Sequence, residues 1–475
     1  MFKKFKATFI GDRAFYRSLM VLLVPMVIQQ GITNFVSLLD NVMVGRLGTE
    51  SMSGVAIVNQ LLFVFNLTVF GGLAGASIFG AQFFGKGDHH GVRAAFRFKI
   101  IFSTVMTVLA IALLAVFGRP LIELFLTDDG SGGDLARTLS EAENYLFVMF
   151  FGLVPFAFSQ SYSSTLRETG ETVSPMTASI LAIVTNFTLN YLLIFGSFGA
   201  PRLGVVGAAI ATVISRYVEA AYLMVQTHRH PDKYPFIVDA FRSLRIPGDI
   251  VRRILVTGTP LVLNELLWSI GTTMVNQSYS TRGLTVVAAT NITNTAWNLF
   301  CVIMFAMGNA VSILIGQKLG AGEIEEAKRT DNKLLFFTVA LHVFIGVLIA
   351  LCAPFIPLIY NTEPAVRTLT TQLLLVAGAA LPLQAFAHVT YFTIRSGGKT
   401  LVTMFFDSFY GLVFTTPLAY LLRLTTGIDI VWLYAVCRAV ELGKGIVGLI
   451  LIKRGYWIHN IVKDQSNEHR VLPEA

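Results

Sequence analysis

Two stretches of this chain repeat one another. Residues 25–87 and 260–322 correspond position by position at a fixed separation of 235 residues. The corresponding pairs include Pro25 with Pro260, Asn41 with Asn276, Asn59 with Asn294, Gln82 with Gln317 and Gly85 with Gly320. A second block, residues 167–172, corresponds to residues 395–400 at a separation of 228. Two weakly similar halves made of apolar segments are typical of secondary transporters, in which the cargo binds between halves that move against each other.

Both halves are apolar enough to lie in a membrane. The chain has 475 residues, of which 54% are hydrophobic and only 13% are charged, and its mean hydropathy is +0.66. Soluble domains carry about 25% charged residues, so this chain has too few to cover a water-facing surface. We predict an all-α polytopic membrane protein in the lipid bilayer. Its twelve transmembrane helices are expected near 17–44, 52–82, 97–118, 142–165, 173–197, 204–227, 253–280, 286–316, 333–358, 370–394, 401–422 and 429–452.

The net charge of +8 indicates membrane topology and not a nucleic-acid partner. Most of the 36 Lys and Arg residues fall in the tails and in alternate loops on one side of the predicted membrane. By the positive-inside rule, we expect both termini to be cytoplasmic in a multi-pass protein of the plasma (inner) membrane. No short apolar core with a small-residue cleavage site follows the basic N-terminal segment, so we expect that segment to be retained.

The longest polar connection divides the chain into two lobes. We predict an N-terminal six-helix lobe over residues 1–227 and a C-terminal six-helix lobe over 254–452. Residues 228–253 form the cytoplasmic linker, expected as an interfacial helix because aromatic and aliphatic residues are mixed with basic ones. Residues 453–475 form a cytoplasmic tail. With six spans each, both lobes enter the membrane from the same side, so a pseudo-two-fold axis along the membrane normal relates them.

Asp40 is the first ionisable residue inside a predicted span. It lies about 23 residues after the start of that span, or roughly 34 Å along the helix axis, near the outer end of the hydrocarbon layer. Two interpretations are open: a solvated helix cap, or a buried carboxylate with a function. The apolar residues that follow, Val42 to Val44, favour the buried carboxylate.

Asn186 and Asn190 lie four residues apart and so share one helix face. Such a pair often only bridges helices. With Asp40 it would instead form an oxygen-rich site that takes a proton or holds a sodium ion. We predict that these three side chains lie within contact distance in the N-terminal lobe and that Na⁺ is the metal ion they would hold.

Glu265 is the second unusual carboxylate. It lies about 12 residues into its span, or roughly 18 Å deep and near the bilayer midplane. Trp268 follows at i+3 on the same helix face, an arrangement suited to an organic cation held by a carboxylate and a ring. A structural carboxylate hydrogen-bonded across helices is the alternative.

Weaker candidates complete the predicted cargo site. Gln384 and His388 lie one turn apart in the tenth span and are placed beside Glu265, although a lone His on an apolar helix is more often a packing residue. Asn294 is also predicted to contact the cargo. Two i,i+3 pairs, Arg216 with Glu219 and Arg438 with Glu441, are expected to be structural ion pairs.

An ordered set of motifs resembles the multidrug and toxic compound extrusion (MATE) family. The segments are LDNVMVGRLGTESMSGVAIVNQL (39–61), GASIFGAQFFGKGD (75–88), LRETGET (166–172), GLTVVAATNITNT (283–295) and ILIGQKLGAG (313–322). The resemblance covers about residues 17–452 and has bacterial, NorM-like and DinF-like features. It implies two pseudo-symmetric bundles of six helices that form a V-shaped central cavity. It also implies export of organic cations, driven by protons or sodium ions.

The resemblance assigns roles to individual residues. Asp40 with Asn186 and Asn190 is similar to the cation site of the N-terminal lobe, although some members carry a carboxylate where this chain has Asn190. Glu265 resembles the glutamate that the NorM-like branch carries in its seventh span. The second carboxylate of that branch, in the tenth span, appears here as Gln384, which leaves the coupling ion open.

We therefore expect an antiporter that exports small organic cations in exchange for H⁺ or Na⁺, acts as a monomer and needs no other cofactor. A flippase for a lipid-linked saccharide is the alternative, but the deep charges are acidic, which favours cationic cargo. An enzyme is not expected, because neither an HExxH nor a GxSxG motif occurs. A channel is also disfavoured, since lone carboxylates at different depths suit alternating access better than a continuous pore.

Overall fold

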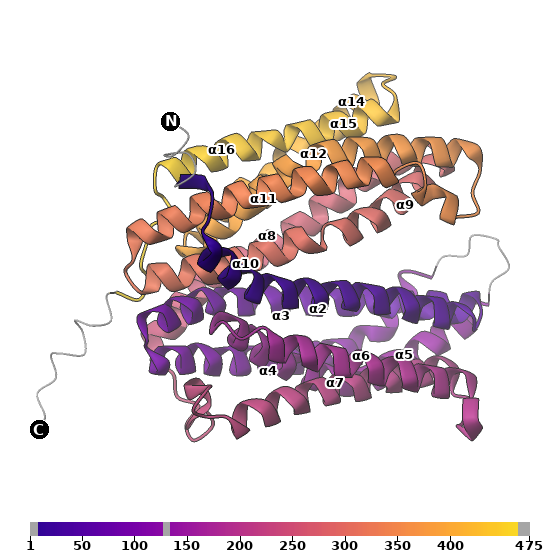
Figure 1. Ribbon diagram of the computed structural model, residues 1–475. Coiled ribbons are helices and arrows are strands. Elements are labelled where there is room, and N and C mark those ends of the chain that lie inside the picture. Colours follow the sequence, from indigo (N-terminus) through magenta and orange to yellow (C-terminus); the bar gives the residue numbers. More distant parts are fainter. Residues whose placement is uncertain (1–7, 127–133, 464–475) are drawn as a thin grey trace, which may run out of the picture. The chain divides into compact units, whose positions relative to one another are not determined.

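The computed structural model describes residues 8–126 and 134–463, and within these ranges the chain is almost entirely helical (Figure 1). No residue in these ranges is assigned to a β-strand. The helices of the first half are α2 (Arg13–Gly45), α3 (Thr49–Lys86), α4 (His89–Glu123), α5 (Leu135–Glu168), α6 (Val173–Phe195) and α7 (Gly204–Arg229). The second half has α8 (Gly248–Ser280), α9 (Leu284–Phe300), α10 (Val302–Gly320), α11 (Ile324–Cys352), α12 (Pro364–Ser396), α13 (Thr400–Met404), α14 (Thr416–Thr425), α15 (Ile430–Val440) and α16 (Leu442–Lys453). Short 3₁₀ helices occur at Ser197–Gly199, Pro235–Ile237 and Ile356–Ile359.

Each of the twelve predicted spans corresponds to helical structure, which confirms the all-α prediction. Eleven helices in the described ranges are long and apolar enough to cross a membrane. The eighth predicted span is divided between α9 and α10 at Cys301. The twelfth is divided between α15 and α16 at Glu441, so each of its parts is shorter than a full span.

The eleventh span has an unusual backbone. Between α13 and α14 it contains two π-helical stretches, η4 (Phe405–Phe409) and η5 (Gly411–Thr415). Most π-helical turns are single bulges inserted in α-helices, and they occur frequently at functional sites. Two in succession mark this span as a place where side chains are redirected.

Contacts divide the chain into two compact units. One comprises Val24–Gly80 and His89–Leu255; the other comprises the described parts of Met1–Leu23, Ala81–Asp88 and Val256–Ala475. The sequence-predicted lobe and linker boundaries stay predictions.

The first unit is packed around faces of α3, α5 and α7. Its core includes Val58, Leu62, Met149 and Leu153, all nearly inaccessible to solvent. Gly207 lets α7 approach α6 closely, because a Cβ atom at that position would lie 2.6 Å from the carbonyl oxygen of Leu193. Small residues at such crossings are the usual means of packing helices in a membrane.

Helices of the second unit also pack closely at glycine residues. Gly346 on α11 and Gly378 on α12 face each other, and a Cβ atom on Gly378 would lie 2.9 Å from the carbonyl oxygen of Gly346. A reciprocal contact joins two equivalent positions of the repeat. A Cβ atom on Gly85 would clash with the backbone of Gln317, and one on Gly320 would clash with the backbone of Gln82. This reciprocity is what a local two-fold relation produces.

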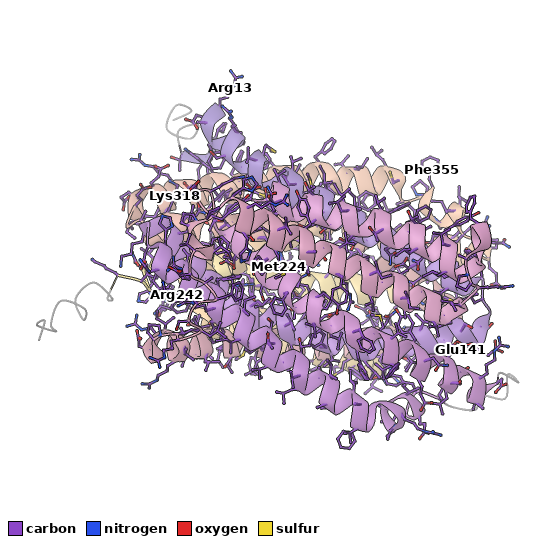
Figure 2. All side chains as sticks on the ribbon, turned by 90° about the horizontal axis from the view of Figure 1, so that it is seen from below. Arg13, Glu141, Met224, Arg242, Lys318 and Phe355 are labelled. Atoms are coloured by element: carbon purple, nitrogen blue, oxygen red, sulfur yellow. The ribbon has the colours of Figure 1, made fainter. Side chains whose placement is uncertain are left out.

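Side chains labelled in Figure 2 mark the two opposite ends of the helices in each unit. In the first unit, Arg242 and Glu141 lie at opposite ends of the helices, with Met224 between them (Figure 2). In the second unit, Lys318 and Phe355 likewise lie at opposite ends (Figure 2). Arg242 and Lys318 belong to the loops that the sequence assigns to the cytoplasmic side.

The linker is a folded loop, and the prediction of an interfacial helix is wrong. Between α7 and α8 it forms only the 3₁₀ turn Pro235–Ile237, in which Phe236 and Ile237 are buried. The Arg97 side chain of α4 donates to the carbonyl oxygens of Asp239, at 2.6 Å, and Ala240, at 2.8 Å. Prolines within this segment remove backbone donors that a helix needs.

Glu171 anchors the linker to the start of α6. Its carboxylate accepts the backbone N–H groups of Val173 and Ser174, each at 3.1 Å. It also pairs with Lys233 of the linker and accepts the Tyr234 hydroxyl at 3.4 Å. The carboxylate therefore caps a helix and holds the linker at the same time.

We predict that acid releases this anchor. Burial alone would raise the pKa of Glu171, but the hydrogen bonds from Lys233, Ser174 and Val173 together lower the pKa below its ordinary value. A lowered pKa stabilises the fold above the unfolded-state value, and the gain is lost as the pH falls through the folded-state value, below about 4.3. Hydrogen exchange corrected for intrinsic rates should show residues 233–240 losing protection in that range.

The matched variants are Glu171→Gln and Asp232→Asn, which neutralises an exposed linker residue. Glu171→Gln should give weak protection at every pH, and Asp232→Asn should behave as wild type. Retention of the acid transition in Glu171→Gln would assign it to another group.

Candidate functional site

The structure brings Asp40, Asn186 and Asn190 together in the first unit, as the sequence predicts. The Asn190 side-chain amide donates to Asp40 Oδ1 at 2.6 Å and to Asn186 Oδ1 at 3.0 Å. The Asn186 amide in turn donates to Thr212 of α7 at 3.3 Å. Three helices thus contribute to one polar cluster. Its role as an ion site stays a prediction.

Asp40 is part of the helix and does not cap it. Helix α2 continues five residues beyond Asp40, to Gly45. The carboxylate is half-buried, while the side chains of Asn186 and Asn190 are 5% and 1% exposed. This environment agrees with the interpretation of Asp40 as a carboxylate enclosed among helices and not with its interpretation as a solvated helix cap.

One acceptor in this cluster has no donor. Among the described residues, none donates a hydrogen bond to Asn190 Oδ1, although this oxygen is buried. Buried polar atoms are usually satisfied by protein groups, water or an ion. Carboxylate and amide oxygens are suitable ligands for a hard monovalent cation, and a protonated carboxyl would supply a donor. No group of three His, Cys, Asp or Glu side chains gathers to hold a metal in the described part of the chain.

A cavity of about 650 Å³ lies within the second unit. All five predicted cargo residues line it: Glu265, Trp268, Asn294, Gln384 and His388. They come from α8, α9 and α12, so residues far apart in sequence converge on one space. Trp268 is 47% exposed, which leaves its ring available for contact. The location of these residues in one cavity is established, and their roles stay predictions.

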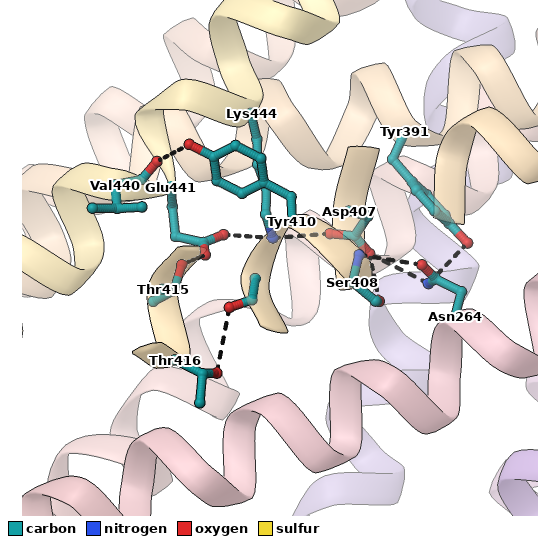
Figure 3. A network of polar contacts seen from close by, with 11 residues as sticks. Asn264, Tyr391, Asp407, Ser408, Tyr410, Thr415, Thr416, Val440, Glu441 and Lys444 are labelled. Carbon is teal, nitrogen blue, oxygen red and sulfur yellow. Dashed lines mark hydrogen bonds and ion pairs between the residues drawn. The ribbon is translucent and has the colours of Figure 1, made fainter. Parts of the chain in front are cut away.

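Sequence reasoning missed a charged network in the wall of this cavity (Figure 3). Asp407 of η4 and Lys444 of α16 form an ion pair at 3.2 Å, and Lys444 also pairs with Glu441 at 2.6 Å. Asn264 of α8 donates to Asp407 Oδ2 at 3.3 Å, and Thr415 of η5 donates to Glu441 at 2.8 Å. The signal was present, because Asp407 and Lys444 are ionisable residues inside predicted spans.

The predicted ion pair between Arg438 and Glu441 is wrong. The Arg438 guanidinium donates to the Tyr434 hydroxyl at 2.7 Å and lies over the Trp297 ring, 4.8 Å from its centroid. Glu441 pairs with Lys444 instead. Both side chains thus have other partners, and Thr415 also donates to Glu441 at 2.8 Å.

The other predicted pair is not found as an ion pair within 4 Å among the described residues either. Arg216 donates to the carbonyl oxygen of Gly152 at 3.3 Å and lies over the Phe156 ring. Glu219 accepts the Ser179 hydroxyl at 2.9 Å. Neighbouring helices supply closer partners to both side chains than the i,i+3 position does.

The cavity wall carries an excess of negative charge when its groups are ionised. Its carboxylates are those of Glu265, Asp407 and Glu441, and its bases are Arg438 and Lys444. Glu265 makes no ion pair within 4 Å in the part of the chain that the structure describes. The lining therefore has one carboxylate more than it has bases, next to the exposed ring of Trp268. Arg395, which does not line the cavity, also acts on Glu265 electrostatically.

Comparison with known proteins decides the family. The sequence model of the family described as MatE matches residues 25–192 and 260–421, which contain the two repeated stretches. The chain belongs to the MatE family. It is thus a multi-pass membrane protein, and the resemblance stated from the motifs is confirmed.

Curated relatives of this MatE protein are similar over most of their length. The probable multidrug resistance protein YoeA of Bacillus subtilis is 26% identical over 435 residues, which cover 90% of this chain and 92% of the relative. The probable multidrug resistance protein NorM of Thermotoga maritima is 25% identical over 376 residues, covering 77% of this chain and 76% of the relative.

A solved structure shares the fold. A mutant of the Vibrio cholerae MATE transporter VcmN superposes with a TM-score of 0.83, covering 93% of this chain and 97% of that one. The sequence identity is 17%, so this likeness supports the fold alone.

We predict that Asn190→Ala destabilises the first unit. The substitution removes the donor to the half-buried Asp40 Oδ1 and to the buried Asn186 Oδ1, a loss of about 1–3 kcal/mol. The measurement is the midpoint of thermal unfolding in detergent. Thr188→Ala is the matched control, because the Thr188 side chain is exposed on the same helix and bonds only the backbone one turn earlier. Equal midpoints for the two variants would contradict a structural role for the Asp40–Asn190 bond.

Proposed function

We propose that this chain is a secondary active efflux transporter, an antiporter that exports organic cations or drugs in exchange for H⁺ or Na⁺ by alternating access. The observation that carries the proposal is the cavity of the second unit, where an unpaired carboxylate and an indole ring face the same space. A carboxylate attracts a cation of any shape, and an aromatic face adds affinity for organic ammonium groups. The names of the curated relatives, which are multidrug resistance proteins, point in the same direction.

Each predicted cargo residue has a role in this proposal. Glu265 supplies the charge and Trp268 the ring on which a planar cation stacks. Asn294, Gln384 and His388 supply adaptable polar contacts. A wall that combines aromatic rings and amides with a few charged groups suits a site that accepts several related molecules.

The cluster of Asp40, Asn186 and Asn190 is proposed to bind the coupling ion. Its short carboxylate–amide contact and its buried acceptor without a donor support this role. Cargo and ion must weaken each other's binding if inward ion flow is to drive cargo outward, because coupling between two sites is reciprocal. Glu265 is the second candidate for coupling, since neutralising it would release a cation directly.

The setting of the transporter is proposed from charge distribution. Basic residues concentrate in the loops on one side, which supports cytoplasmic termini and insertion in the plasma (inner) membrane. We expect the monomer to be sufficient, because each unit has its own core and the cavity is formed within one unit.

A lipid-linked saccharide flippase is the alternative function. Its anionic cargo would require bases that are free to bind phosphate. In the cavity wall Lys444 is already engaged by two carboxylates and Arg438 lies over an aromatic ring. The geometry therefore favours cationic cargo.

We predict that efflux of ethidium from proteoliposomes depends on two carboxylates. Wild type should move ethidium under an imposed proton or sodium gradient. Asp40→Asn should abolish the dependence on the gradient, and Glu265→Gln should lower transport by about tenfold or more because the charge that holds the cation is lost. Glu325→Gln is the control, since its side chain is 77% exposed on α11.

Two results would count against the proposal. Wild type that moves no cation under either gradient would exclude cation export, and flipping of a lipid-linked saccharide would be tested next. Normal coupled transport in both Asp40→Asn and Glu265→Gln would show that other groups couple and bind.

A further inference from the structure

A basic residue lies in the wall of a cavity proposed for cations. Lys444 of α16 is buried, with 9% of its side chain exposed, and no part of the proposed cargo chemistry requires it. Its ammonium lies between the carboxylates of Asp407, at 3.2 Å, and Glu441, at 2.6 Å. A buried ammonium needs such partners, but two carboxylates beside a cavity for cations do not need a lysine.

The two carboxylates face the cavity more than the lysine does. The side chain of Asp407 is 28% exposed and that of Glu441 is 23% exposed. The lysine therefore lies behind the carboxylates and neutralises charge that would otherwise be presented to the cargo.

The backbone around Lys444 is shaped to hold it there. The helix break at Glu441 leaves the Val440 carbonyl outside the helix, and the Tyr410 hydroxyl donates to that carbonyl at 3.0 Å (Figure 3). Gly411 lies beside the ammonium, since a Cβ atom there would be in van der Waals contact with Lys444 Nζ at 3.7 Å. Asp407 projects from the first π-helical stretch and is oriented by Asn264.

The charge balance of the wall depends on this residue. With Lys444 present, three carboxylates face two bases, which leaves one negative charge for the cargo. Without Lys444, two negative charges would remain. The number of charges on the best-fitting cargo should follow this balance, because a cationic group that enters the cavity loses hydration, and only a carboxylate without a base compensates that loss.

We propose that Lys444 sets the charge of the cargo: by compensating one of the two negative charges of Asp407 and Glu441, it shifts the preference of the cavity from divalent towards monovalent organic cations. This inference rests on the proposed function, since it presumes that cations bind in the cavity. Lys444 acts through the two carboxylates and is a specificity-determining residue.

The test is equilibrium binding of two dyes to the purified full chain at pH 8. Ethidium and propidium share one phenanthridinium core, and propidium carries an additional quaternary ammonium. Wild type should bind ethidium more tightly. Lys444→Gln should shift the ratio of the two dissociation constants towards propidium by about tenfold, because one more carboxylate is uncompensated. Lys444→Arg keeps the charge and should keep the wild-type ratio.

Two further variants test the charge balance independently: one should cancel the shift and the other should move the ratio in the opposite direction. The double variant Lys444→Gln with Asp407→Asn removes one charge of each sign and should restore the preference for ethidium. Asp407→Asn alone removes a negative charge while the lysine stays, so the ratio should move away from propidium. This second variant tests the proposal even if Lys444→Gln does not fold, which a thermal unfolding curve reveals.

The outcomes separate this inference from the proposed function. Ethidium binding by wild type with an unchanged dye ratio in Lys444→Gln and in Asp407→Asn overturns the role of Lys444 and leaves cation export standing. Binding of neither dye by wild type contradicts both.

Discussion

An ionised side chain inside an apolar helix loses its hydration, and it persists only where a neighbouring group or water compensates that loss. In this structure the compensation comes from other helices. Asp40 of α2 is bonded by Asn190 of α6, and Lys444 of α16 lies between two carboxylates, one of them on a different span. Packing within each unit is thus organised around a few polar clusters as well as an apolar core.

The buried polar clusters of the two units occupy equivalent positions of the repeat but differ in charge. In the first, Gln29 of α2 donates to Ser179 of α6 at 2.8 Å, and Ser179 donates to Glu219 of α7 at 2.9 Å. In the second, Asn264 and Lys444 both contact Asp407. Gln29 and Asn264 are equivalent at the separation of 235, and Ser179 and Asp407 at 228. One repeated scaffold therefore carries a neutral hydroxyl in one unit and a charged network in the other, which fits different tasks for the two units.

The fold was predictable because apolar periodicity and length determine where helices form in such a chain. The same logic identified Asp40 and Glu265, since carboxylates in apolar spans are costly and therefore informative. Asp407 and Lys444 obey the same rule, but they lie on different spans, and the sequence does not show which ionisable residues of different spans meet in the fold. The mistaken pairing of Arg438 with Glu441 has another cause. Arg438 contacts the Tyr434 hydroxyl and the Trp297 ring, whereas Glu441 contacts Lys444 and Thr415, and i,i+3 spacing alone does not decide between such alternative partners.

The central claim of this account is that a coupling ion and a cationic cargo oppose each other's binding to one protein. Its most direct measurement is the dissociation constant of ethidium for the wild-type chain across a series of sodium concentrations at fixed pH, and across a pH series without sodium. The account predicts that ethidium binds more weakly as one of the two ions increases, with that dependence removed in Asp40→Asn. An ethidium affinity that is unaffected by either ion, or that rises with it, would contradict the account.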